Sequence, residues 1–233
     1  VGADAVSYNG LIDGCAKSGD AVKAEAWVEV MSDLRVEVGV VTYNMLIAAW
    51  SKARNPKIAE EWFHKMSAKK VVPNIVTYST IMNGWAKVQE PEKTEDWFRR
   101  MLNARMDANV VSYGVVIDSW VKAQQLEKAE AWLWRMVAAK VEPNVITFTT
   151  IICALAKHGK PEKAEQCYYC MMEMGIKANL ISSNAVAKSW AKVDESHKVR
   201  EWLERVRSAG RTDAGISSES TEEEVLSRLK LRR

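Results

Sequence analysis

The sequence contains no apolar run of about 18 residues, the length that a membrane-spanning helix needs. It has only 3 histidines and 11 glycines in 233 residues, and no stretch alternates polar and apolar residues with a period of two. The missing alternation excludes a protein built mainly from β-strands. The four cysteines are irregularly spaced, which argues against a disulfide framework and favours reduced core residues in a reducing compartment: Cys15, Cys153, Cys167 and Cys170.

An excess of charge of one sign is also missing. The formal net charge is +3 and the sequence pI is about 8.6, so the charge balance alone does not indicate a nucleic-acid partner. The chain opens without an initiator methionine, and Asp4 occupies a position that asparagines fill later in the sequence. We therefore expect the sequence to begin inside a longer array, beyond any targeting segment.

What the sequence does contain is a repeat of 35 residues. Aromatic residues recur at this spacing, at Tyr8, Tyr43, Tyr78, Tyr113 and Phe148. Such a period is typical of stacked helical units that bury a core only against their neighbours. The boundaries are 1–4 (the end of a preceding unit), 5–39, 40–74, 75–109, 110–144, 145–179, 180–214, and 215–233 (a linker and a short C-terminal helix). The sixth unit is degenerate, with Ser183 in place of the aromatic residue and Val206 in place of a methionine.

Each unit carries two helical patterns. In residues 40–74, apolar residues recur at helical spacing from 41 to 50 and again from 58 to 66. Between them, Asn55 is predicted to cap the second helix and Pro56 to take its first position, where a missing N–H is harmless. Pro91 and Pro161 mark the same start in other units, Asp20 can cap it in the first, and Pro73 and Pro143 follow the ends of second helices. The sequence predicts an all-α solenoid of antiparallel helix pairs.

Tryptophans form two columns at the repeat spacing. One column contains Trp27, Trp62, Trp97, Trp132 and Trp202, and the other contains Trp50, Trp85, Trp120 and Trp190. Aromatic columns at helical spacing predict a core between repeats rather than base-stacking platforms. Trp134 lies outside both columns, and we expect it to be exposed.

Motifs within these units resemble the pentatricopeptide repeat. They include Val-Val-Thr-Tyr-Asn-Met-Leu-Ile at 40–47, Val-Pro-Asn at 72–74 and Val-Glu-Pro-Asn-Val-Ile-Thr-Phe at 141–148. The unbroken period of 35 is similar to that of the P class of the family, whereas a 34-residue tetratricopeptide repeat would drift by one residue per unit. The resemblance implies a right-handed superhelix that binds single-stranded RNA in a mitochondrion or plastid.

The resemblance further implies that each repeat reads one base through its fifth and last residues. The pairs are Asn9 with Gly39, Asn44 with Asn74, Ser79 with Asn109, Gly114 with Asn144, Thr149 with Asn179, and Asn184 with Ala214. By the family's code, Ser or Thr with Asn resembles an adenine reader, and Asn with Asn resembles a pyrimidine reader. Gly114 offers no side-chain hydrogen bond, and Gly39 and Ala214 depart from the expected polar residues. The implied RNA core is 5′-Y-C/U-A-(A)-A-Y-3′.

Capping is an alternative role for these polar positions, because Asn, Ser and Thr beside a helix start often satisfy free backbone N–H groups. However, the fifth position varies among Asn, Ser, Gly and Thr, whereas its neighbours stay aromatic or apolar. Capping alone does not call for that pattern, so base reading is favoured.

Two further columns bear on RNA. A β-branched apolar column comprises Val6, Val41, Val76, Val111, Ile146 and Ile181, which the resemblance places between successive bases; ordinary core packing is the alternative. A lysine column comprises Lys17, Lys52, Lys87, Lys122, Lys157 and Lys192. Lysine near a helix C-terminus is favourable by about 0.3–1 kcal/mol, but arginine would serve equally and never appears there. Phosphate contact at all six lysines predicts a salt slope of about −4.

Catalysis finds little support in the sequence. His64, His158 and His197 fall in different columns and are expected to be solvated helix residues. Cys167 and Cys170 form a Cys-x-x-Cys without a second pair, so core cysteines are favoured over a zinc site. We expect no catalytic residue, metal, cofactor, membrane contact or small-molecule substrate. The competing hypothesis is a protein-binding scaffold, since helical solenoids often bind peptides.

Overall fold

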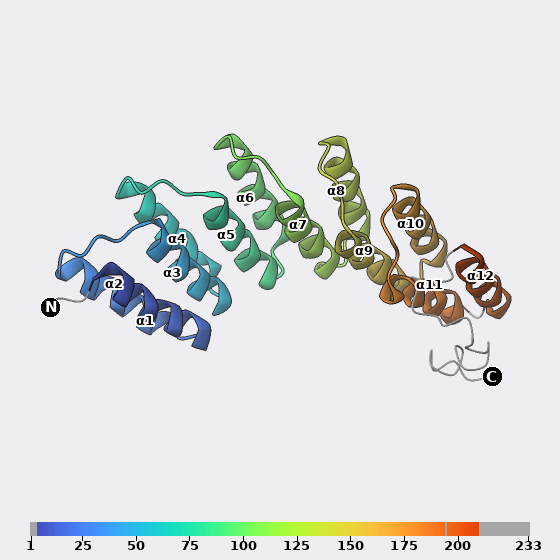
Figure 1. Ribbon diagram of the computed structural model, residues 1–233, viewed down its shortest axis with the longest axis horizontal. Coiled ribbons are helices and arrows are strands. Elements are labelled where there is room, and N and C mark those ends of the chain that lie inside the picture. Colours follow the sequence, from blue (N-terminus) through green and yellow to red (C-terminus); the bar gives the residue numbers. More distant parts are fainter. Residues whose placement is uncertain (1–3, 194, 210–233) are drawn as a thin grey trace. The chain divides into compact units, whose positions relative to one another are not determined.

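The computed structural model describes residues 4–193 and 195–209 (Figure 1). Within these ranges the chain forms twelve α-helices and no β-strand, which confirms the all-α prediction. None of the described helices is long and apolar enough to cross a bilayer. The helices are α1 (Ala5–Ser18), α2 (Ala21–Asp33), α3 (Val40–Lys52), α4 (Pro56–Ala68), α5 (Ile75–Lys87), α6 (Pro91–Asn103), α7 (Val110–Lys122), α8 (Leu126–Ala138), α9 (Val145–Lys157), α10 (Pro161–Glu173), α11 (Leu180–Lys192) and α12 (Ser196–Ala209). The predicted C-terminal helix and Ala214 lie outside the described residues.

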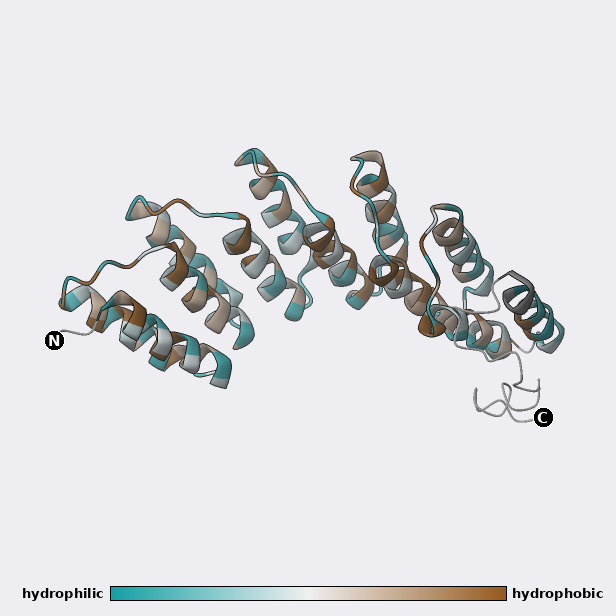
Figure 2. Ribbon diagram, in the orientation of Figure 1, coloured by the Kyte–Doolittle hydropathy of each residue, from teal (hydrophilic) through white to brown (hydrophobic). Residues whose placement is uncertain are grey.

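The chain forms two compact units, residues 1–123 and 124–233. In the first unit, α1 packs against α2, α3 against α4 and α5 against α6, while the first helices α1, α3, α5 and α7 stack in that order. In the second unit, α9 packs against α10 and α11 against α12, with α9 stacked on α11. Figure 2 shows hydrophobic and hydrophilic residues on the same helices, as expected when one stripe of each helix is buried.

Proline and acidic residues start the second helices largely as predicted. The Asp20 carboxylate accepts a hydrogen bond from the Lys23 N–H at 3.1 Å and caps α2. Proline occupies the first turn of α4, α6 and α10. The prediction for Asn55 was wrong, because its side chain makes no capping hydrogen bond. Pro56 has no N–H, so the first turn of α4 has fewer donors for a side chain to satisfy.

The helices α1 to α10 are each followed by a residue of left-handed backbone conformation. First helices are followed by Gly19, Arg54, Gln89, Gln124 and Gly159, and second helices by Arg35, Lys70, Arg105, Lys140 and Gly175, all with positive φ. The Asn55 N–H donates to the Trp50 carbonyl at 3.0 Å, which is the closing bond of a Schellman motif. A non-glycine residue in this conformation costs about 1–2 kcal/mol. The fold therefore imposes this turn against the intrinsic backbone preference of the residue.

The tryptophan columns form the core as predicted. Trp62, Trp85, Trp97, Trp120, Trp132, Trp190 and Trp202 are buried, whereas Trp27 and Trp50 are half-buried. The Trp97 ring lies edge-on to Phe63, with centroids 4.7 Å apart. Trp134 is 45% exposed, which confirms its place outside the core.

The cysteines form no disulfide, but the prediction that all four lie in the core was wrong. Cys167 is buried, whereas Cys15, Cys153 and Cys170 are half-buried. A helix in a two-layer solenoid buries only one stripe, so residues at the edge of that stripe stay partly accessible.

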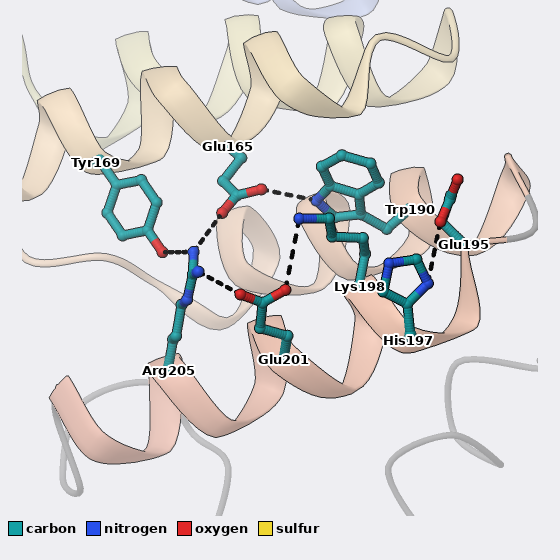
Figure 3. A network of polar contacts seen from close by, with 8 residues as sticks. All are labelled: Glu165, Tyr169, Trp190, Glu195, His197, Lys198, Glu201 and Arg205. Carbon is teal, nitrogen blue, oxygen red and sulfur yellow. Dashed lines mark hydrogen bonds and ion pairs between the residues drawn. The ribbon is translucent and has the colours of Figure 1, made fainter.

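Polar contacts hold the degenerate sixth repeat to the fifth (Figure 3). Trp190 in α11 donates its Nε1–H to Glu165 Oε2 of α10 at 2.9 Å, and Arg205 in α12 donates to Glu165 Oε1 at 3.3 Å. Ser183, which replaces the aromatic residue, lies 3.1 Å from the Tyr168 hydroxyl in a buried hydrogen bond. The sixth repeat therefore exchanges a ring contact for a hydrogen bond.

Two glycines of the first unit, one tightly packed and one not, provide a test of helix packing. A Cβ atom on Gly84 in α5 would lie 2.7 Å from Ser51 Oγ and 3.3 Å from Pro56 Cβ, whereas one on Gly114 in α7 would meet nothing within 4 Å. We expect Gly84→Ala to lower the free energy of unfolding by about 1–3 kcal/mol through overpacking. Gly114→Ala should raise it by about 0.5–1 kcal/mol, because alanine loses less backbone entropy. Urea unfolding followed by circular dichroism measures both; a stabilising Gly84→Ala would contradict the close approach.

Candidate nucleic-acid interface

The β-branched column lies at the second residue of each first helix. Its side chains are between 53% and 76% exposed: Val6, Val41, Val76, Val111, Ile146 and Ile181. Core packing, the alternative that the sequence left open, is therefore wrong for this column. Each first helix presents an exposed apolar side chain that the fold itself leaves uncovered.

The last residue of each of the first five repeats is the N-cap of the next first helix. Asn74, Asn109, Asn144 and Asn179 each accept a hydrogen bond through Oδ1 from the backbone N–H three residues later, at 2.8–3.1 Å. Gly39 holds the same position before α3 without a side-chain bond. The capping interpretation thus holds for this last column. Capping uses the amide oxygen and leaves the amide nitrogen for other contacts.

The fifth residue of each repeat lies within a first helix, so the capping interpretation is wrong for that column. Asn9 Oδ1 accepts a hydrogen bond from Thr42 Oγ1 at 2.7 Å, and Asn44 Oδ1 accepts one from Thr77 Oγ1 at 2.6 Å. Ser79, Gly114 and Asn184 are half-buried and make no side-chain hydrogen bond with the described part of the chain. These polar residues are set beside the exposed apolar column.

The structure brings one predicted pair into direct contact. Asn44 Nδ2 donates to Asn74 Oδ1 at 3.3 Å, and Asn74 Oδ1 also accepts from the Thr77 N–H at 3.1 Å. This arrangement fixes the orientation of both amides, since each oxygen is occupied by a donor of the protein. The exposed Asn74 side chain is left with its Nδ2 donors, which suit the acceptor atoms of a base edge.

Thr149 departs from the expectation of a hydroxyl presented to a base. Its Oγ1 is buried and has no hydrogen-bond partner among the described residues. An unpaired buried hydroxyl costs about 1–3 kcal/mol. Threonine in a helix populates two χ1 rotamers, so a rotation about χ1 is required before this hydroxyl can meet a ligand.

The six column lysines are not equivalent. Lys17 forms an ion pair with Asp13 at 2.6 Å, and Lys122 forms one with Asp118 at 2.5 Å. Lys52 donates to the Ala16 carbonyl at 3.4 Å, at the C-terminal end of α1, so the helix-terminus role applies to it. Lys87, Lys157 and Lys192 are exposed and form no ion pair or hydrogen bond with the described residues. Three of the six ammonium groups are thus engaged by the protein.

A pocket of about 370 Å³ lies between α9 and α11 in the second unit. Its lining residues are Cys153, Ala156, Lys157, Ile181, Asn184, Ala185, Lys188 and Lys192. It brings together the fifth residue of the sixth repeat (Asn184), a member of the β-branched column (Ile181) and two members of the lysine column (Lys157 and Lys192). Lys188 was not among the predicted site residues, because no other repeat has lysine at the equivalent position.

The cysteines and histidines form no chemical site in the described residues. Burial raises the pKa of the Cys167 thiol to about 12, so it stays protonated at neutral pH. No group of three or more metal-binding side chains occurs in the ranges that the structure describes. His64 and His197 are exposed helix residues as predicted, whereas His158 lies just after α9 and its ring nitrogen is 2.8 Å from the Ala154 carbonyl oxygen.

The fold and these columns define a helical-repeat protein whose first helices carry exposed β-branched, polar and lysine side chains at a fixed spacing. A family model described as the pentacotripeptide-repeat region of PRORP matches residues 4–198. The chain belongs to the pentatricopeptide-repeat family. No curated protein matches the sequence.

Solved pentatricopeptide-repeat structures share this fold. The crystal structure of PPR10 from maize has a TM-score of 0.78 and 21% identity, covering 89% of this chain and 30% of that chain. PPR10 in complex with an 18-nt psaJ RNA element has a TM-score of 0.71 and 20% identity, covering 88% and 30%. Nuclear proteinaceous RNase P 2 from A. thaliana has a TM-score of 0.65 and 15% identity, covering 83% and 42%. The match therefore spans about 30% of the length of PPR10.

Proposed function

We propose that the chain binds single-stranded RNA sequence-selectively, with one base per repeat of 35 residues. It would act in organellar RNA processing, stability or translation by occupying the RNA or guiding a partner. The observation that carries this proposal is the exposed β-branched column on the first helices, adjacent to a polar column. The complex of PPR10 with an RNA element supports it, since that protein shares the fold.

Each column has a distinct physical part in the proposed binding. An exposed Val or Ile covers the face of an unstacked base, which removes apolar surface of both from water. The fifth and last residues then meet the Watson–Crick edge, which single-stranded RNA leaves open. Lysine ammonium groups neutralise the phosphates and release their counterions.

The proposed RNA core is 5′-Y-C/U-A-(A)-A-Y-3′, in which Ser79 with Asn109 reads the third base. Ser79 is well suited, because its hydroxyl is not used by the described residues and can donate or accept. At the second base, Asn44 and Asn74 are already hydrogen-bonded to each other, which holds the pair in position. Thr149 at the fifth base first requires the rotation about χ1.

Binding of a short labelled RNA containing CCAAAC, compared with GGUUUG and with the DNA version, tests the proposal. We expect CCAAAC to bind most tightly, with each mismatched base costing about 1–3 kcal/mol. Ser79→Asn should weaken binding to CCAAAC and strengthen binding to CCCAAC, in which only the third base is changed. Equal weak binding to all oligonucleotides would contradict base reading. An absence of RNA binding even at low salt would favour the protein-binding scaffold.

A further inference from the structure

We propose that the pocket between α9 and α11 is the main binding site of this chain for the RNA backbone, with Lys188 as a phosphate-binding residue beside Lys157 and Lys192. This inference rests on the proposed function, because its occupant is a phosphate group of the bound RNA. It adds a phosphate-binding residue outside the lysine column, and it makes the boundary between the fifth and sixth repeats the strongest contact with the RNA backbone.

Three lysines line the pocket. Asn184, Lys188 and Lys192 follow one another at intervals of four residues, so they lie on one face of α11. Lys157 reaches the same pocket from α9, which packs directly against α11. None of the three lysines forms an ion pair within the described ranges. The pocket therefore concentrates positive charge that the protein does not neutralise.

The equivalent position in other repeats carries a different charge. Asp13, Ala48, Asn83, Asp118 and Cys153 precede Lys188 at intervals of 35 residues. Where that position is an aspartate, it pairs with the column lysine four residues later, as in Asp13 with Lys17 and Asp118 with Lys122. In the sixth repeat this position is Lys188, which adds a second positive charge beside Lys192 instead of neutralising it. This position sets the strength of each backbone contact.

The surroundings of the pocket strengthen its attraction for an anion. Ala156, Ile181 and Ala185 form apolar walls, and a cleft with low-dielectric walls focuses the field of the charges that line it. Its volume of about 370 Å³ lies in the range of about 300–1,000 Å³ usual for ligand pockets. The pocket has room for more than a bare phosphate. Asn184 is the fifth residue of its repeat and Ile181 belongs to the β-branched column, and both columns are proposed to contact bases. Their presence in the pocket favours an RNA chain over a small anion.

Binding of Lys188→Ala to CCAAAC RNA over a salt series tests the pocket in the full chain. We expect about fivefold weaker binding at about 0.1 M salt and a salt slope smaller by about 0.7, the value for one phosphate contact. The same loss should occur with GGUUUG, because a phosphate contact does not read sequence. The matched control is Lys57→Ala, an exposed lysine of α4 with no hydrogen bond or ion pair to the described residues. It should leave both quantities unchanged.

Asp118→Lys reproduces the arrangement of the sixth repeat in the fourth. It frees Lys122 and adds an ammonium group, so we expect binding at least fivefold tighter and a slope steeper by about 0.7–1.4. Unchanged binding in both Lys188→Ala and Asp118→Lys would overturn the role of this position.

The rate of alkylation of Cys153 measures the accessibility of the pocket in the wild-type protein. Cys153 lines the pocket, and burial raises its thiol pKa, so the reaction with N-ethylmaleimide is followed at alkaline pH by peptide mass spectrometry. We expect CCAAAC RNA to slow alkylation of Cys153 and to leave half-buried Cys170, the internal control on α10, unchanged. Protection by inorganic phosphate but not by RNA would assign the pocket to a small anion and overturn the proposal.

Failure of this inference is distinguishable from failure of the proposed function. If the wild-type chain prefers CCAAAC but Lys188→Ala behaves like Lys57→Ala, only the pocket assignment is wrong. If the wild-type chain binds no RNA and Cys153 is not protected, both are wrong. Circular dichroism spectra of each variant identify any loss caused by misfolding.

Discussion

Trp97→Ala is expected to lower the free energy of unfolding of the first unit by about 3–5 kcal/mol. The Trp97 side chain is 0% exposed, and its ring contacts Phe63 and, at 5.9 Å between centroids, Tyr78. Arg100 lies over the ring at 4.8 Å. The buried indole N–H has no hydrogen-bond partner among the described residues, so alanine also removes an unpaired donor and the loss of stability should fall nearer the lower value.

Trp134→Ala is the matched control, because it deletes the same side chain from a site that is 45% exposed. We expect it to change stability by no more than about 0.5 kcal/mol. Urea unfolding followed by circular dichroism compares the two variants, and repeat arrays require the transitions of the two units to be fitted separately. Similar losses for Trp97→Ala and Trp134→Ala would mean that the tryptophan column is not the core between repeats.

Replacing Lys87, Lys157 and Lys192 together by alanine is expected to weaken RNA binding about a hundredfold at about 0.1 M salt. These three ammonium groups have no protein partner among the described residues and are exposed. Each phosphate contact contributes about 0.7 to the salt slope, so the slope should become shallower by about 2. The affinity of the variant should approach that of the wild type as salt rises.

The control for this prediction replaces Lys17, Lys52 and Lys122 instead. Two of these lysines are paired with aspartates and the third donates to backbone carbonyls, so less of their charge is available to RNA. We expect the control to lose less than the first variant in both affinity and slope. Equal losses of affinity in the two triple variants would show that Lys17, Lys52 and Lys122 give up their contacts within the protein when RNA binds. All six lysines would then contribute equally to RNA binding.

The repeat fold was predictable from the sequence because its signals are local and recur. Proline at the start of α4, α6 and α10 and the tryptophan columns each needed only helical spacing to interpret. The exposure of Val41 and its equivalents was not predictable, because an apolar residue on a helix is equally consistent with a core face.

The contacts and burial of each predicted site residue depend on the tertiary structure. The spacing of four residues between Asp13 and Lys17 is compatible with an ion pair, but aspartate occurs at that position in only two repeats and so does not stand out as a recurring residue. Nothing in the sequence indicates that the Thr149 hydroxyl is buried, since that depends on its rotamer. The charge of the pocket likewise appears only when α9 and α11 are brought together.

The left-handed turns have a consequence for how such a chain can change in length. Arg35, Lys70 and Arg105 adopt nearly the same φ, at 56°, 60° and 58°, although two residue types are involved. A second copy of residues 75–109 inserted after Asn109 would thus meet matching backbone at both joints. Insertion of a whole repeat of 35 residues preserves the contacts between neighbouring helices. Insertion of a few residues would instead rotate the buried face of a helix away from its neighbours. If each repeat contacts one base, as proposed, one duplication would lengthen the bound RNA sequence by one nucleotide.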